Sequence, residues 1–454
     1  MFFKASARCG VHLITGIFAL GVCSASMSAL AQSTKPECLA HYEVIVPLRE
    51  PDYRVSSEWR IVKEQNDYDA LPYIVRDDKS QDVIAAGSAS VLPKGEGLPN
   101  TDIQIMRVNR DGKEIWHQVH HRKGDQDVAG LVKLDNGGVA VVSTDYYAKG
   151  KGRILLSFFD KDGKKSFERI FSEDGVMLSA TDMISVGSAG DLLVSANVRP
   201  EEGVRHTQIY RLSQKGKLIW KRAYDPSAEN IVVGLGYDAG HDLIFGLGSI
   251  RLDDGRQAGL LMSLDDRGAV RWQEVYPRGK ALILRDIAGD LDGGYVVSGD
   301  SRPYAKKDRH AGFVMKIDGA GEVMWQRYLA GRYYFYGQQI ELLEDGRAVV
   351  LMDGQPVTPF DSGHSRFVLL NENGYLVGDE AFIENSDLSL RSFVVDRDGR
   401  RYVSGSTRNL YTEFDEADGV KSDDYRNFFV FALPPVPEYK SPCGRDNAFD
   451  EFLP

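Results

Sequence analysis

A unit of about 50 residues recurs along most of the chain. In Ile283–Ala330 it contains two tight turns, Asp292-Gly293-Gly294 and Asp318-Gly319-Ala320-Gly321, each flanked by segments in which apolar and polar residues alternate. Asp-Gly turns between such segments are typical of β-hairpins. The last glycine of the second turn recurs at steps of 51, 53, 52, 53 and 53 residues, at Gly112, Gly163, Gly216, Gly268, Gly321 and Gly374. Four short antiparallel strands in repeats of this length predict a β-propeller.

A tryptophan stands four residues after this glycine in four of the repeats, at Trp116, Trp220, Trp272 and Trp325. Large aromatic side chains carry much of the buried area of a β core. We therefore expect these tryptophans to pack between neighbouring blades.

The two ends of the repeat region predict how the ring closes. Six complete repeats begin near Tyr68, and a seventh, Ser389–Pro434, stops after its third strand. Arg54–Lys63 has the pattern of the outermost strand of the other repeats, with Trp59 in the tryptophan position. A blade closed from both ends of the chain leaves no free sheet edge at the closure. The sequence thus predicts an all-β, seven-bladed propeller with four antiparallel strands per blade, built from a closing strand at about 54–63, repeats at about 68–433 and a C-terminal tail at 434–454.

The first 31 residues have the layout of a secretory signal peptide. Lys4 and Arg8 precede an apolar run from about Val11 to Val22, and small residues lead to Ala31. The alternative, a transmembrane anchor, is disfavoured because the run is shorter than the roughly 20 residues that a span needs. We expect residues 1–31 to be removed and residues 32–454 to form a single periplasmic or secreted domain without an integral membrane segment.

The cysteines agree with export. Cys9 and Cys23 lie in the predicted signal peptide, whereas Cys38 precedes the first strand and Cys443 follows the last. In an oxidising compartment this pair is predicted to form a disulfide bond. The sequence has no C-x-x-C motif, which favours a structural over a redox role.

Charge and motifs exclude several classes of function. The formal net charge is −11, the opposite of the sign that a nucleic-acid partner usually requires. The sequence contains no G-x-S-x-G, H-E-x-x-H, P-loop or Rossmann motif. The sequence therefore identifies no catalytic residue, and it predicts no resident metal or cofactor.

The candidate binding residues lie in the long connections between strands, which a propeller gathers on one face. An arginine follows the second strand in four repeats, and the planar guanidinium binds carboxylate, sulfate or phosphate groups through paired hydrogen bonds. The alternative is that each arginine pairs with acids of its own loop. Aromatic residues on the same face would suit a protein or glycan partner. The predicted ligand-binding residues are Arg199, Arg251, Arg302, Arg408, Tyr304, Tyr333 and Tyr334.

Three histidines, His206, His310 and His364, precede the third strand of their repeats. They are interpreted either as surface residues or as part of a site at the mouth of the channel. Two functions therefore remain open. The first is an exported binding or scaffold propeller that recognises a protein, an anionic ligand or a glycan through its long-loop face. The alternative is a periplasmic hydrolase or lyase whose site lies at the channel mouth.

The repeat resembles known propeller repeats. The segments DGGYVVSGDS and AGFVMKIDGAGEVMWQRYL are similar to repeats of exported bacterial β-propellers, and the aspartate, glycine and tryptophan of the second segment resemble the tryptophan-docking repeat of quinoprotein propellers. The resemblance covers Tyr68–Leu433 and implies the fold alone. The quinoprotein motif A-x-D-x-x-T-G-x-x-x-W has lost its threonine here, and such enzymes usually have eight blades. Both departures argue against a pyrroloquinoline quinone enzyme. The replacing residues are Asp111, Lys215, Arg267 and Ala320.

Overall fold

Alternating apolar residues place the chain in β-strands wherever the structure describes it. The computed structural model describes residues 43–48, 53–54, 56–63, 69–91, 100–225, 227–290, 293–302, 310–331, 333–355, 365–382, 387–413 and 421–436. Within these ranges every regular element is a strand, so no helix there has the length and hydropathy to cross a bilayer. In β3 (Trp59–Lys63) half-buried and exposed residues alternate, because the side chains of a strand point in turn to its two faces.

Consecutive strands pair antiparallel in groups of four. One group is β4 (Asp69–Arg76), β5 (Val83–Val91), β6 (Asn100–Val108) and β7 (Glu114–His120). The next is β8 (Asp125–Lys133), β9 (Val139–Ala148), β10 (Lys151–Phe159) and β11 (Lys165–Phe171). It is followed by β12 (Val176–Val186), β13 (Asp191–Pro200), β14 (His206–Leu212) and β15 (Leu218–Tyr224).

The second half of the chain continues this pattern. It contains β16 (Asn230–Asp238), β17 (Leu243–Arg251), β18 (Gln257–Leu264) and β19 (Val270–Tyr276), then β20 (Ala281–Gly289), β21 (Tyr295–Arg302), β22 (Ala311–Ile317) and β23 (Val323–Gly331). After these come β24 (Tyr334–Leu342), β25 (Ala348–Gln355), β26 (Arg366–Leu370) and β27 (Leu376–Ala381). The last strands are β28 (Asp387–Val395), β29 (Arg401–Glu413) and β30 (Lys421–Leu433).

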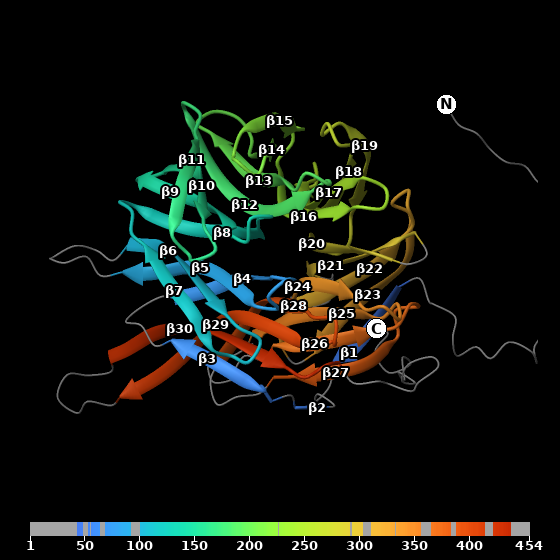
Figure 1. Ribbon diagram of the computed structural model, residues 1–454. Helices are drawn as coiled ribbons and strands as arrows, with labels where there is room; N and C mark the ends of the chain where they lie inside the picture. The colour runs from blue at the N-terminus through green and yellow to red at the C-terminus, as the bar shows by residue number, and fades with distance from the viewer. Residues whose placement is uncertain are drawn as a thin grey trace, which may run out of the picture. The chain divides into compact units, whose positions relative to one another are not determined.

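The first strand of each group lies innermost and contacts the first strand of the next group. β4 contacts β8, and the contacts continue through β12, β16, β20, β24 and β28, which returns to β4. Figure 1 shows these strands around a common centre. The hydrophobic clusters lie between neighbouring sheets, for example where Leu71 and Met106 meet Tyr402 and Phe428. The described chain is therefore an all-β propeller.

The predicted seven separate blades are not what the hydrogen bonding shows. The described strands form six sheets, because β16–β19 and β20–β23 are joined, with β1, into one sheet of nine strands. The link is the parallel pairing of Gln257 with Ala281, and the Gln257 N–H donates to the Lys280 carbonyl at 3.4 Å. The joint forms because β20 begins beside the start of β18.

The closing strand is shorter than the predicted 54–63. β3 pairs antiparallel with β30, from Trp59 opposite Ala432 to Lys63 opposite Phe428. Arg54 belongs instead to β2 (Tyr53–Arg54), which lies parallel to β27. A further strand that the sequence did not predict, β1 (Glu43–Leu48), lies parallel to β23. The N-terminal residues thus add a strand to the outer edges of three sheets.

The predicted role of the tryptophans is confirmed. Trp116 donates through Nε1 to the Lys161 carbonyl at 3.0 Å, and Trp325 donates to the Glu372 carbonyl at 3.1 Å, in each case in the outer turn of the next group of strands. The turn glycine has positive φ, +74° at Gly374, and a Cβ there would lie 2.9 Å from the Trp325 ring. The recurring glycine is thus required both by the backbone conformation of the turn and by the ring that packs on it.

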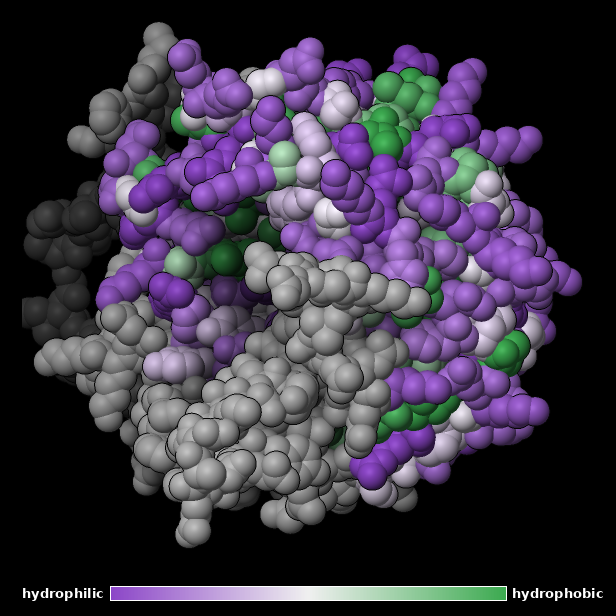
Figure 2. Space-filling view, turned by 90° about the vertical axis from the view of Figure 1, so that its left-hand side faces the viewer, coloured by the Kyte–Doolittle hydropathy of each residue, from purple (hydrophilic) through white to green (hydrophobic). Residues whose placement is uncertain are grey.

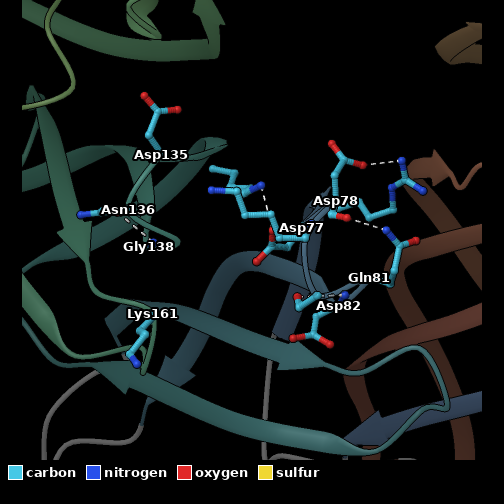
Figure 3. A network of polar contacts seen from close by, with 12 residues as sticks. Asp77, Asp78, Gln81, Asp82, Asp135, Asn136, Gly138 and Lys161 are labelled. Carbon is cyan, nitrogen blue, oxygen red and sulfur yellow. Dashed lines mark hydrogen bonds and ion pairs between the residues drawn. The ribbon is translucent and has the colours of Figure 1, made fainter.

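A buried ion network joins the first two groups of strands at their short turns (Figure 3). Arg107 contacts Asp77 at 3.0 Å and Asp82 at 2.9 Å, and Lys133 of β8 lies 2.8 Å from Asp77. Arg107 also donates to the Lys161 carbonyl at 3.4 Å. Burial raises the pKa of Asp77, but the hydrogen bonds from Lys133, the Lys79 N–H and Ser80, together with the charge of Lys133, outweigh burial and lower the pKa of this carboxyl. We assign the network a structural role because all its charges are paired.

A candidate ligand site in the central channel

The predicted arginines do not form a ring of unpaired cations. Arg251 lies 3.1 Å from Glu229, which also contacts Arg205 at 3.4 Å. Arg302 donates from Nε to Nε2 of His310 at 2.7 Å. Arg199, at the end of β13, is exposed. For Arg251 the structure therefore supports pairing with a nearby acid rather than a role as an open anion site.

Arg408 does not lie in a loop. Its backbone belongs to β29 and pairs with Arg426 of β30, because this hairpin extends as far as Glu413 opposite Lys421. The side chain of Arg408 lies outside the described residues, as do Tyr304, His364, Cys38 and Cys443.

The two predicted tyrosines have different environments. Tyr333 is only 9% exposed and belongs to the hydrophobic cluster of Trp325 and Phe335, which also contains Val46 and Leu48 of β1. Tyr334 is half-buried, and its ring meets that of His310 edge-on, with centroids 5.7 Å apart.

Of the three histidines, the structure describes His206 and His310, and these two have separate environments. His206 contacts the Val204 carbonyl at 3.2 Å, whereas burial and the charge of Arg302 lower the pKa of His310. Neither lines the central channel. In the described part of the chain, no three His, Cys, Asp or Glu side chains are grouped in a way that could hold a metal ion.

A cavity with a volume of about 570 Å³ lies in the central channel. All the innermost strands line this cavity. At this point, the pairing of each innermost strand with the second strand of its own group has a register shift, that is, a β-bulge. Such a bulge changes the direction of a side chain that would otherwise continue the alternation. The residues at this position in β12, β16, β20, β24 and β28 are Thr181, Val233, Arg285, Gln338 and Arg391.

Three successive innermost strands carry donor side chains at the bulge. Arg285 is held by Asp300, 2.6 Å from its Nε, and Arg391 has a longer ion pair of 3.9 Å with Asp353. Among the described residues, the Gln338 amide has no hydrogen-bond partner. The two guanidinium side chains are 31% and 37% exposed and line the cavity. We call Arg285, Gln338 and Arg391 the donor sector.

Acidic side chains also line the wall, on β8, β12 and β20. Asp182 accepts hydrogen bonds from the N–H groups of Met183 and Leu235, both at 2.7 Å, and Asp286 accepts them from Ile287 and Ile340 at 2.8 and 2.9 Å. Enclosure by the surrounding strands raises the pKa of Asp182 to about 7 and that of Asp286 to about 6. Asp127 of β8 also lines the cavity, and desolvation raises its pKa.

A smaller polar pocket of about 240 Å³ lies beside Arg251, with Arg205, Glu229 and Gln257 in its wall. Its two arginines share Glu229, so each guanidinium group already has an ion-pair partner. On the face in Figure 2 the described side chains are mostly hydrophilic, with isolated hydrophobic residues between them. Of these two cavities, the channel is the one lined by a guanidinium group without a close ion pair, that of Arg391.

Comparisons with solved structures return distant matches. The WD40 domain of Neurospora crassa Pan2 has 12% identity and a TM-score of 0.49, with 86% of this chain and 100% of that chain covered. The periplasmic gluconolactonase of Pseudomonas aeruginosa has 13% identity and a TM-score of 0.47, with 77% and 100% covered. No family model and no curated protein matches the sequence. Similarity at this level carries no conclusion about function.

Proposed function

We propose that the protein is a binding propeller whose ligand is a small anion, such as a carboxylate or an acidic sugar, held in the central channel. The observation that carries the proposal is the donor sector, because Arg285, Gln338 and Arg391 occupy one register position on three successive strands that line a cavity. A volume of about 570 Å³ lies in the range of small-molecule sites. Two guanidinium groups with an amide between them supply several directed donors to a carboxylate.

The proposal moves the binding site from the long-loop face to the channel. Arg251 on that face is paired with Glu229, whereas the only described partner of Arg391 is Asp353 at 3.9 Å, too distant for a hydrogen bond. The Arg391 donors are thus available to a ligand. We also infer that the nine-stranded sheet works as two units, because β16 and β20 each take a separate place in the sequence of contacts around the channel.

We further propose that the protein is exported to the periplasm or the medium after removal of residues 1–31. The sequence pattern of Met1–Ala31 supports this, as set out above. Edman sequencing of the protein from culture medium and periplasmic extract tests it. A mature N-terminus near Gln32 in either fraction is expected, and recovery of uncleaved protein from the cytoplasm alone would contradict export.

The binding proposal is tested by titration calorimetry with gluconate, glucuronate and citrate. Replacing Arg391 by Gln removes a charged donor while Arg285 keeps its ion pair with Asp300. Loss of a hydrogen bond to a charged group costs about 1.5–3 kcal/mol, so we expect affinity to fall about 10- to 100-fold. Arg199→Gln, on an exposed residue outside the channel wall, is the matched control and should leave binding unchanged.

Two results would contradict the proposal. If an anion binds the wild type and Arg391→Gln with the same affinity, its site is not the donor sector. If the control variant Arg199→Gln loses binding instead, the long-loop face predicted from the sequence is the binding surface. Circular dichroism of each variant separates loss of binding from loss of folding.

A second candidate is an enzyme of the hydrolase or lyase class with its site in the same channel. The observation that favours it is Asp182, whose pKa of about 7 suits a general acid or base at neutral pH. Both of its carboxylate oxygens, however, already accept backbone N–H groups. The test is turnover of lactones and acidic glycosides. Activity that persists in Asp182→Asn would exclude Asp182 as the general acid or base of such an enzyme.

A further inference from the structure

The donor sector has a counterpart on the opposite wall of the channel. In the order of contacts around the centre, β24 lies three strands from β12 in one direction and three from β8 in the other. β24 carries Gln338, the middle residue of the donor sector, whereas β8 and β12 carry Asp127 and Asp182. Asp286 lies on the donor side, next to Arg285, but both of its oxygens accept backbone N–H groups. Asp127 and Asp182 thus lie across the channel from Gln338.

Asp127 has the properties of a binding carboxylate. Among the described residues it has no hydrogen-bond or ion-pair partner, although it lines the cavity. Asp182, by contrast, uses both oxygens to join two strands. Asp127 thus offers an open acceptor, and Asp182 adds negative potential beside it.

The charges of Asp127 and Asp182 and the charge of Arg391 all act on one residue, Tyr73 of β4. Burial is the main cause that raises the pKa of its phenol, the charges of Asp182 and Asp127 raise it further, and the charge of Arg391 lowers it. One residue of the channel wall therefore lies within the electrostatic range of the acidic side chains and of the donor sector.

A simple anion would satisfy only half of this site. Its charge would be attracted by Arg285 and Arg391 but repelled across the cavity by Asp127 and Asp182, and the opposing terms reduce its net affinity. A molecule with a carboxylate at one end and an ammonium group at the other would be attracted at both ends. We propose, on the basis of the proposed function, that the channel ligand is a small zwitterion whose carboxylate binds the donor sector and whose ammonium group binds Asp127.

The experiment compares ligands that differ only in the ammonium group. β-Alanine, 4-aminobutyrate and 6-aminohexanoate are titrated into the mature protein at about pH 8, where the channel acids are ionised, in parallel with propionate, butyrate, hexanoate and butylamine. We expect at least one amino acid to bind about tenfold more tightly than its carboxylate counterpart, as one charge-assisted hydrogen bond allows. The chain length of the amino acid that binds most tightly measures the distance between the donor sector and Asp127.

Variants assign the gain to Asp127. Asp127→Asn should reduce the affinity for the amino acid to that of the plain carboxylate, and Asp127→Glu should restore part of the difference. Asp253→Asn, on an exposed residue outside the channel wall, should have no effect. Because Asp127 has no described side-chain partner, its replacement is not expected to disturb folding.

The results separate this inference from the function on which it rests. Equal binding of amino acids and carboxylates would overturn the zwitterion and leave the anion site intact. Butylamine bound as tightly as the amino acids would overturn both, since the carboxylate would then contribute nothing. If no compound binds at millimolar concentration, both are overturned as well.

Discussion

Asp182 of β12 accepts a hydrogen bond of 2.7 Å from the backbone N–H of Leu235 on β16, one group of strands further round the channel. Asp286 of β20 makes the same contact with Ile340 of β24 at 2.9 Å. Gln339 continues the series by accepting from the Phe393 N–H at 2.9 Å. Side chains that follow the bulge thus fasten neighbouring innermost strands together.

Replacement of Asp286 by Ala should therefore destabilise the fold. The Ile340 N–H would lose its acceptor. An unsatisfied buried donor costs about 1–3 kcal/mol, and we expect the free energy of unfolding to fall by that amount in urea denaturation. Asp290→Ala is unsuitable as a control because Asp290 pairs with buried Lys316, whereas the exposed Asp253 is suitable. Unchanged stability of Asp286→Ala would mean that the strands are held without this contact.

The same acids give stability a definite pH dependence. Enclosure raises the pKa of Asp182 to about 7 and of Asp286 to about 6, from an ordinary value of 3.8, so the folded protein holds protons that the unfolded chain has released. The groups that face them are the N–H donors named above, the other aspartate and Glu341, whose own pKa burial raises to about 7. The free energy of unfolding should therefore fall as the pH rises from 3.8, the ordinary pKa, to about 7, the raised pKa of Asp182.

Denaturation of the wild type and of Asp286→Asn across that pH range checks this expectation. The decline in the free energy of unfolding should be shallower in the variant, since one of the raised groups is gone. A steeper decline in Asp286→Asn than in the wild type would contradict this expectation. It would show that folding favours the ionised form of Asp286.

A pair of glycine variants separates packing from backbone strain. Gly374 has φ +74° and contacts Trp325, whereas Gly346 has φ +81° with nothing within 4 Å of the place where a Cβ would lie. Alanine costs about 1–2 kcal/mol at either position through the left-handed backbone. Only Gly374→Ala also displaces a ring, which adds about 1–3 kcal/mol. We expect the lower Tm for Gly374→Ala, and equal values for the two variants would show that the ring adjusts freely.

Cys38 and Cys443 remain a predicted disulfide, and both lie outside the described residues. The intact mass of the secreted protein should show the loss of two thiol hydrogens, and a non-reduced digest should link the two peptides. Removal of such a crosslink typically costs about 2–5 kcal/mol in small secreted domains, so Cys443→Ser should lower the Tm. Two alkylatable thiols in freshly secreted protein would exclude the bond.

The sequence predicted the propeller because its turns and tryptophans recur at fixed spacing, and each has a local physical cause. It did not predict that β18 and β20 would join, since one residue pair between neighbouring sheets has no sequence pattern. The burial of Tyr333 has no sequence signal either, because an aromatic run has the same pattern on a surface and in a hydrophobic cluster.

The donor sector has a signal in the sequence, the regular spacing of its three residues. Arg285, Gln338 and Arg391 are spaced by 53 residues, the length of the repeat itself, and so share one column when the repeats are superposed. What the sequence alone does not give is the bulge that turns this column toward the channel. Superposition of repeats, followed by a search for chemistry within each column, would have proposed these residues.

The first strands of the chain have consequences for the order of events during synthesis. β1 lies against β23, β2 against β27 and β3 against β30. Each of these N-terminal strands therefore stays without its partner until a strand far later in the chain has been translated. A truncated chain that ends before β30 cannot pair β3, and such a chain is left with an open edge at the closure of the ring.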